Sequence, residues 1–146
     1  MGTRSRVGIM HGDVLKSVYC HYDGYLSCTG QILQEHYDSV KTNRLVRRGD
    51  NSGIHEEIED MNFYNEHDED KELAWQVAHS LEEYIEQTHN CGGEYYYVMK
   101  DGVWYAGAVY ETQGLVKNGL VALKDAITVI GEPEAEETQI AEVLFK

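Results

Sequence analysis

The dipeptide Asp101-Gly102 is the feature that most constrains how this chain can fold. Asp-Gly pairs favour the tight type I′ turn of a two-residue β-hairpin, because both central residues of that turn need a positive φ. The runs on either side, 95–99 and 103–109, contain aromatic and β-branched residues that favour strands. A two-residue turn at Asp101-Gly102 sets the pairing of the two strands and places Tyr97 opposite Ala106, so a large side chain faces a small one. The sequence therefore predicts a hairpin here.

A second hairpin is predicted near the N-terminus, where residues 5–11 and 14–21 flank Gly12-Asp13. Its register places Arg6 opposite Tyr19 on the more polar of the two sheet faces. The other face carries Val7, Ile9, Val14 and Val18. The core is therefore expected on that second, more apolar side.

Apolar residues at three- and four-residue spacing predict helices in the rest of the chain. The predicted helices cover 29–40, 42–48, 54–61, 71–88 and 134–144, and 119–130 starts extended and turns helical near 124. The fold class is thus α+β, a single domain over 1–146, with an antiparallel sheet built from the two hairpins and helices packed on one face.

The charge of the chain is strongly negative, with 12 Lys and Arg against 26 Asp and Glu and a net charge of −14. Residues 1–50 hold seven basic and five acidic side chains, whereas 51–146 hold five and 21. Such a surface repels nucleic acid and anionic membranes, so neither is expected as a partner. Three cysteines without CxxC spacing, and no long apolar run, predict a cytoplasmic protein with reduced thiols.

Seven residues in and just after the N-terminal hairpin form the candidate ligand-binding set: Arg4, Arg6, Tyr19, His21, Tyr22, Asp23 and Tyr25. Strand alternation puts the first four on one sheet face. Arginine offers forked donors to a phosphate, tyrosine can stack on a base, and aspartate can accept from a base or ribose. The set predicts a pocket for a nucleotide-like or small anionic ligand, and the alternative is an ordinary sheet surface with salt bridges.

Signals for catalysis or metal binding are sparse. The chain has no GxxxxGK[ST], GxGxxG, CxxC, HExxH or GxSxG motif. His21 and Asp23 form an HxD pair that could reach one ion, but no third ligand lies nearby in the sequence. Cys20 and His21 are strand neighbours and face opposite ways, so they cannot form a nucleophile and its base. We therefore assign no catalytic residue, metal ligand or cofactor, and favour a protein that is not an enzyme.

Three N-terminal segments carry a family resemblance: residues 1–5, 16–26 with the stretch YCHYDGY, and 30–37. They resemble a family of small proteins encoded by bacteriophages and mobile elements, in which a TRS segment precedes a YCHWDGY-like stretch and a GxxLxxxY helix. Here Tyr22 stands where tryptophan is common. The resemblance covers about the first 50 residues. It implies a phage or mobile-element setting, in the cytoplasm of a host cell, and no particular activity.

Three functions are weighed on these grounds. The first is a phage-encoded accessory protein that captures a nucleotide-like or small anionic ligand and so counteracts host defence signalling. The second is an acidic inhibitor that mimics nucleic acid on a host enzyme, motivated by the acidic residues after position 50. The third is a hydrolase of phosphoesters or nucleotides that depends on His21 and Asp23. The partner is thus a small ligand or a host protein, and self-association is left open.

Overall fold

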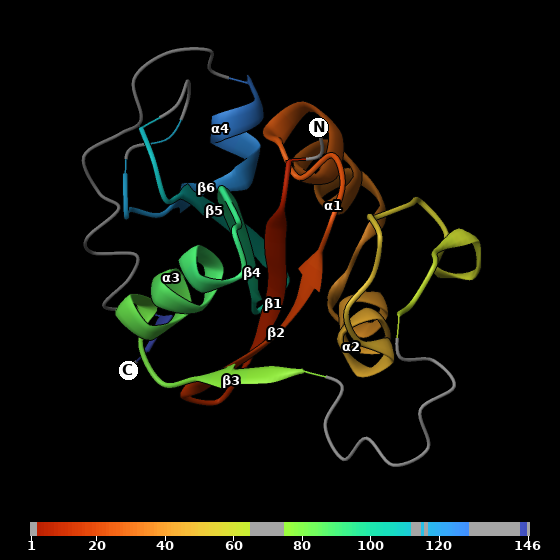
Figure 1. Ribbon diagram of the computed structural model, residues 1–146, viewed down its shortest axis with the longest axis horizontal. Coiled ribbons are helices and arrows are strands. Elements are labelled where there is room, and N and C mark those ends of the chain that lie inside the picture. Colours follow the sequence, from red (N-terminus) through yellow and green to blue (C-terminus); the bar gives the residue numbers. More distant parts are fainter. Residues whose placement is uncertain (1–2, 65–74, 112–114, 116, 129–143, 146) are drawn as a thin grey trace.

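A six-stranded sheet forms the centre of the computed structural model, which describes residues 3–64, 75–111, 115, 117–128 and 144–145 (Figure 1). Its strands are β1 Ser5–His11, β2 Val14–Cys20, β3 Gln76–Ala78, β4 Tyr95–Lys100, β5 Val103–Ala108 and β6 Val121–Ala122. They lie in the order β3-β2-β1-β4-β5-β6. Only the β1–β4 pairing within this sheet is parallel. The predicted α+β fold class is confirmed.

Both predicted hairpins form in the predicted register. Tyr97 pairs with Ala106 across β4 and β5, and Arg6 pairs with Tyr19 across β1 and β2. The turn at Asp101-Gly102 has φ values of 52° and 80°, both positive as a type I′ turn requires. The central parallel pairing of β1 with β4 then joins the two hairpins into one sheet.

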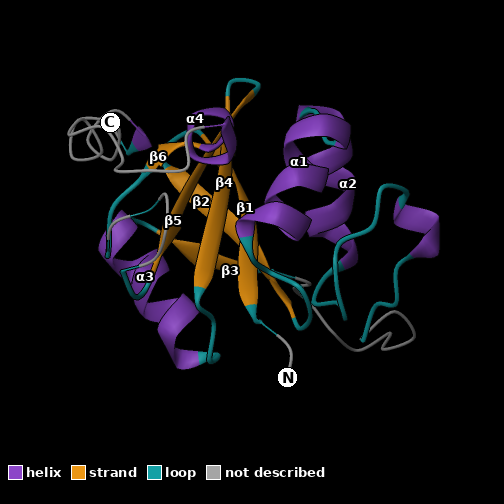
Figure 2. Cartoon of the chain, turned by 90° about the horizontal axis from the view of Figure 1, so that it is seen from above, coloured by secondary structure: helices purple, strands orange, loops and turns teal. Residues whose placement is uncertain are grey.

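Helices cover both faces of the sheet rather than the single face predicted. They are the π-helical η1 Leu26–Gly30, α1 Gln31–His36, α2 Ser39–Arg48, the 3₁₀-helical η2 Ile58–Asp60, α3 Leu81–Asn90 and α4 Leu123–Thr128. Figure 2 shows α1 and α2 on one side of the strands and α3 on the other. The physical reason lies in β4, where the neighbours Tyr96 and Tyr97 point to opposite faces and are both fully buried. Both faces of β4 must therefore be shielded from solvent by helices or neighbouring segments.

The two covers define two apolar cores. On one face, Leu33 of α1, Leu45 of α2 and Leu123 of α4 pack with the side chains of β1, β4 and β5. On the other, Tyr84 of α3 lies edge-on to Tyr96, with ring centroids 5.7 Å apart. Burial on both sides explains why β4 is apolar along almost its whole length.

The predicted helix 71–88 is wrong in its first part. Residues 76–78 form the edge strand β3 on β2, and α3 begins only at Leu81. The Ser80 side chain caps that helix by accepting a hydrogen bond of 3.0 Å from the Glu83 amide, and Glu83 accepts one of 2.7 Å from the His79 amide. This Ser-x-x-Glu cap fixes the start of the helix within a longer apolar stripe. Residues 71–74 lie outside the described residues, as do 134–143 of the predicted last helix.

The other helical predictions hold with shifted bounds. The predicted helix 29–40 starts earlier, as η1, and ends at His36, and the predicted 54–61 shortens to η2. The short β6 followed by α4 confirms the change from strand to helix within 119–130. Within the described residues, no helix is both long and apolar enough to cross a lipid bilayer.

β4, β5 and the chain at Gly119 pack closely around Gly107, and a substitution at this residue tests how tight that packing is. A β-carbon at Gly107 would overlap the carbonyl oxygen of Gly119 and the ring of Tyr96, which are themselves joined by a hydrogen bond of 2.6 Å. Because neither the Gly119 carbonyl nor the Tyr96 ring can move away easily, we expect Gly107→Ala to lower the free energy of unfolding by about 3 kcal/mol. Urea denaturation, read as a fall in midpoint at constant slope, measures this loss.

Gly102→Ala is the matched control, because its β-carbon would meet no atom within 4 Å although φ is 80°. Its cost is limited to the left-handed backbone, about 1 kcal/mol. Equal midpoints for the two variants would contradict the packing described around Gly107.

Candidate functional site

The candidate site is a pocket of about 390 Å³ on the α3 face of the sheet. Its wall combines parts of β1, β2, β3 and α3 with the residue that follows α2 by two positions. The lining residues are Arg6, Tyr19, Asp50, Gln76, Gln87, Asn90 and Cys91. The pocket therefore joins segments from four separate parts of the sequence.

Arg6 is the central charged group of this pocket. Its side chain is only 3% exposed, and it donates from Nε to Ser17 Oγ at 3.0 Å and from Nη2 to the Ser17 carbonyl oxygen at 3.1 Å. Among the described residues, no carboxylate oxygen lies within 4.0 Å of the guanidinium. Asp50 lines the same pocket but makes no ion pair with Arg6 within 4.0 Å, and a buried cation without a direct partner is costly, so an anion next to Arg6 would be stabilised.

Tyr19 stands beside Arg6 and links it to the rest of the predicted set. Its hydroxyl lies 2.5 Å from His21 Nδ1, and its backbone amide donates to Asp50 Oδ1 at 2.9 Å. Burial raises the pKa of Tyr19, and the charge and hydrogen bond of Arg4 act in the opposite direction. Arg4 therefore lies close to the Tyr19 hydroxyl, which stays protonated near neutral pH.

The pocket also offers acceptors. The carboxylate of Asp50 lines it and is positioned by the Tyr19 amide. Gln87 donates from Nε2 to the carbonyl oxygen of Val77 at 2.9 Å, whereas its Oε1 is buried and has no hydrogen-bond partner among the described residues. A buried acceptor of this kind is uncommon in a native protein, and a ligand donor would satisfy it.

The seven predicted residues divide into those at the pocket and those away from it. Arg6 and Tyr19 line it, and Arg4 and His21 lie against Tyr19. Tyr22 is half exposed and rests edge-on against His21, with ring centroids 4.4 Å apart. The structure thus brings five of the seven into one chain of contacts that starts in the pocket.

Asp23 and Tyr25 lie in the turn that follows, outside this chain of contacts. Asp23 has φ 57°, and its carbonyl oxygen accepts from the Thr29 hydroxyl at 2.7 Å. Its carboxylate raises the pKa of Tyr25 and, after burial, that of Cys28, so its charge acts on residues in and next to η1. Gly24 is needed because a β-carbon there would lie 2.6 Å from the β-carbon of Ser5. The Asp-Gly part of the YCHYDGY stretch is therefore explained by the turn itself.

Five lining residues are absent from the predicted set: Asp50, Gln76, Gln87, Asn90 and Cys91. The last three lie on or directly after α3, and the sequence analysis places that helix on the same face as the other helices. The sequence does contain one indication for Gln87. It follows the inward-facing Tyr84 by three residues, so it lies near the buried side of the helix.

The geometry gives little support to thiol or metal chemistry. Cys20 is fully buried on the opposite face, where burial raises its pKa to about 12. In the described part of the chain, no three His, Cys, Asp or Glu side chains gather as they would around a metal ion. His21 Nδ1 lies 2.5 Å from the Tyr19 hydroxyl, and among the described residues no hydrogen bond or ion pair joins His21 to Asp23.

Alkylation tests the assignment of Cys20 to the core. With iodoacetamide at about pH 8, we expect the folded protein to take label at Cys28 and Cys91, which are partly exposed, and none at Cys20. The unfolded protein in urea should take label at all three cysteines, which serves as the control. Mass spectrometry of the digested protein locates the label, and rapid modification of Cys20 in the folded state would contradict its burial.

Fold and pocket together define an α+β protein with a polar pocket around a buried arginine. Comparison of the chain with protein-family models, with curated proteins and with solved structures finds no match in any of the three. Its function is therefore inferred from the chemistry of the pocket.

Proposed function

We propose that this protein is a non-enzymatic binding protein that captures a small anionic, nucleotide-like ligand in the pocket around Arg6. One observation carries the proposal: Arg6 is only 3% exposed, and no described carboxylate oxygen lies within 4.0 Å of its guanidinium. A phosphate or carboxylate would supply the missing charge and accept the N–H donors that Ser17 does not use.

The remaining groups narrow the chemistry of the ligand. Asp50 and Gln87 Oε1 accept hydrogen bonds, so the ligand carries N–H or O–H donors apart from its anionic group. Tyr19 offers a ring beside the cation. A volume of about 390 Å³ suits a small molecule and lies in the usual range of ligand pockets. A sugar phosphate or a nucleotide has this combination of groups.

The setting that we propose follows from the N-terminal resemblance to small phage and mobile-element proteins. A protein of this kind would act in the cytoplasm of the host cell and remove a nucleotide-like signal used in defence. Binding without turnover is sufficient for that role, because sequestration alone lowers the free concentration of the signal.

The alternatives have weaker support. For the charge mimic, the acidic stretch near η2 is partly neutralised within the chain, since Glu59 pairs with Arg44 at 3.1 Å and, besides a backbone hydrogen bond, the charges of Arg44 and Lys41 both lower the pKa of Glu59. For the hydrolase, His21 Nδ1 contacts the Tyr19 hydroxyl, and among the described residues no hydrogen bond or ion pair joins His21 to Asp23, so no base and orienting partner stand together there.

A ligand screen tests the proposal directly. Phosphate, ribose phosphates, nucleoside monophosphates and cyclic nucleotides would each be added at about 1 mM while the midpoint of thermal unfolding is followed. We expect at least one anion to raise the midpoint and its uncharged parent nucleoside or sugar to have no effect. Lys16→Met and Arg47→Met are introduced first, because these two cations line a separate pocket that could also bind an anion. In that protein, adding Arg6→Met should abolish the shift, whereas adding Lys117→Met, which removes an exposed cation, should retain it. If none of these anions stabilised the protein, the proposal would fail.

A further inference from the structure

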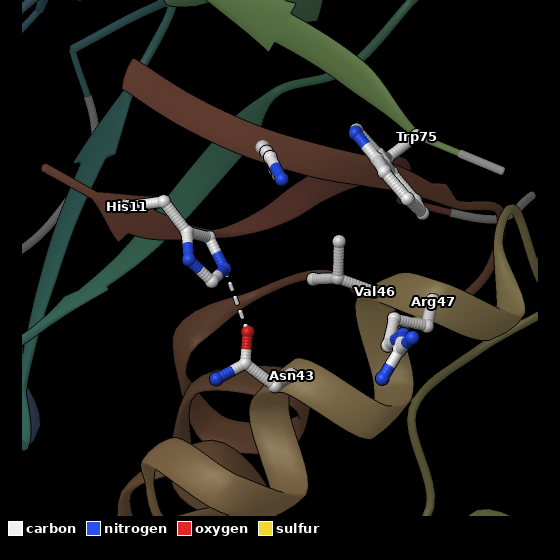
Figure 3. Close-up of a pocket in the computed structure, with 6 residues that line it drawn as sticks. His11, Asn43, Val46, Arg47 and Trp75 are labelled. Atoms are coloured by element: carbon white, nitrogen blue, oxygen red, sulfur yellow. Dashed lines mark hydrogen bonds between the residues drawn. The ribbon is translucent and has the colours of Figure 1, made fainter. Parts of the chain in front are cut away.

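A second pocket, of about 410 Å³, lies on the opposite side of the sheet, between the β1–β2 hairpin and α2 (Figure 3). It is lined by His11, Lys16, Asn43, Val46, Arg47 and Trp75. We infer that this pocket binds a planar aromatic anion, of the class to which nucleoside monophosphates belong. The inference is independent of the proposed function, because none of the described residues lines both pockets.

The charge of this second pocket is the first ground. Among the described lining residues, Lys16 and Arg47 are cations, His11 is a third basic side chain and none is acidic, in a chain whose net charge is −14 with histidine counted as neutral. Among the described residues, neither Lys16 nor Arg47 has a carboxylate oxygen within 4.0 Å. A hollow with this local excess of positive charge attracts an anion even though the protein as a whole repels one.

The apolar wall is the second ground. Val46 is 2% exposed and forms the floor, and the partly buried indole of Trp75 stands at one side of the hollow (Figure 3). The ammonium of Lys16 lies 5.1 Å from the centroid of the Trp75 ring. Because this ammonium lies over the face of the indole, a flat ligand ring that stacks there takes its place, and the displaced ammonium can then pair with a phosphate attached to that ring.

The amide of Asn43 adds a directional group. Its Oδ1 is 2.7 Å from His11 Nε2, and the dashed line of Figure 3 marks this contact. Because Oδ1 can only accept, His11 donates, and the amide N–H₂ of Asn43 is left to donate to a ring nitrogen or carbonyl. The pocket thus offers cations, a stacking surface and an amide. This combination fits a nucleobase linked to a phosphate better than it fits a base alone or a phosphate alone.

Proton–nitrogen correlation spectra of the intact protein test the inference, since the chain has two tryptophans and hence two indole N–H signals. We expect AMP to move the Trp75 signal saturably with a Kd of about 1 mM or lower. The Trp104 signal should stay in place, because its Nε1 donates to the Tyr37 carbonyl oxygen in the core. Trp75→Phe assigns the two signals.

Matched variants and probes identify which half of the ligand matters. Lys16→Met with Arg47→Met should weaken AMP binding at least about tenfold, whereas Arg44→Met, one turn earlier on α2 and exposed, should leave it unchanged. Adenosine and inorganic phosphate should each bind at least about tenfold more weakly than AMP.

Several outcomes would overturn the inference. It fails if none of AMP, GMP, CMP and UMP moves the Trp75 signal up to about 5 mM. It also fails if adenosine or phosphate binds as well as AMP, because one half of the ligand would then be irrelevant. Loss of the Trp75 shift in Arg6→Met, with the fold intact, would place the ligand in the other pocket instead.

Discussion

The double variant Arg6→Met, Ser17→Ala should lose affinity for the anionic ligand by at least about 100-fold and yet be more stable than the original protein. The first effect follows because the guanidinium supplies the charge-assisted hydrogen bonds, each of which contributes about 1.5–3 kcal/mol. The second follows because the buried cation has no described carboxylate partner, so its desolvation is a cost that methionine does not share. We expect a gain of about 1–3 kcal/mol in the free energy of unfolding.

Single variants separate the charge from its hydrogen bonds. Arg6→Met alone leaves the buried Ser17 hydroxyl without the guanidinium that it now binds, which costs about 1–3 kcal/mol. It should therefore be less stable than the double variant. Ser17→Ala alone should keep most of the ligand affinity, because the Ser17 carbonyl still accepts from Nη2.

Urea denaturation and calorimetric titration with the ligand found in the screen measure both quantities for the four proteins. A double variant that is clearly less stable than the original would show that Arg6 stabilises the ligand-free fold, and would remove the main support for the pocket. Retained affinity in that variant would show that the anion binds elsewhere.

The part of the site that could be predicted is the part that strand alternation determines. Once Gly12-Asp13 is taken as a turn, the pairing of Arg6 with Tyr19 follows from counting residues, and the structure confirms it. The same counting places Cys20 and His21 on opposite faces of the strand, which argues against a thiol nucleophile with His21 as its base. Local rules are sufficient there because each contact joins neighbours in one hairpin.

The lining residues that the sequence does not predict reach the pocket through contacts between distant segments, which no local sequence pattern indicates. Asp50 reaches the pocket through a backbone pairing at the end of β2, where the Asn51 amide donates to the Tyr19 carbonyl at 2.8 Å. Gln87 and Asn90 reach it because α3 crosses the second face of the sheet. The run Tyr95-Tyr96-Tyr97 contains the signal for that second cover, since adjacent large residues on one strand face opposite ways.

The charge of Arg6 favours ligand binding only because α3 buries this side chain against the sheet. On an open sheet face, the guanidinium would be hydrated and would need no partner. Under α3 it is almost fully buried, and the same side chain becomes a cation that lacks an anion. The sequence therefore identifies the residue, whereas the packing of a distant helix gives it a binding role.

Alkaline unfolding is the second large effect that the structure predicts, and it arises from three fully buried tyrosines, Tyr84, Tyr96 and Tyr97. Their hydroxyls donate to the carbonyl oxygens of Tyr97, Gly119 and Gly24 at 2.7, 2.6 and 2.6 Å. Burial raises the pKa of each phenol well above its usual value of 10.0. Each therefore has to stay protonated for the protein to stay folded.

The direction of the pH effect follows from these raised pKa values. Because the folded pKa is higher than the unfolded one, the stability from each phenol is complete below about pH 10 and is lost as the pH rises above it. Each group contributes a slope of about 1.4 kcal/mol per pH unit, so the three together give about 4 kcal/mol per unit. Cys20, with its pKa raised to about 12, adds to the loss from about pH 9.

Urea midpoints between about pH 8 and pH 11 measure this slope, and phenolate absorbance after a rapid pH jump identifies the groups responsible. Exposed phenols such as Tyr110 should ionise at once, whereas the buried ones should ionise only as the protein unfolds. Tyr96→Phe should start from lower stability, because Gly119 loses its donor, yet lose about 1.4 kcal/mol less per pH unit. Tyr110→Phe should leave the slope unchanged. If both variants kept the original slope, a cause other than phenol burial would have to explain the alkaline limit, such as the growing negative charge of an already acidic chain.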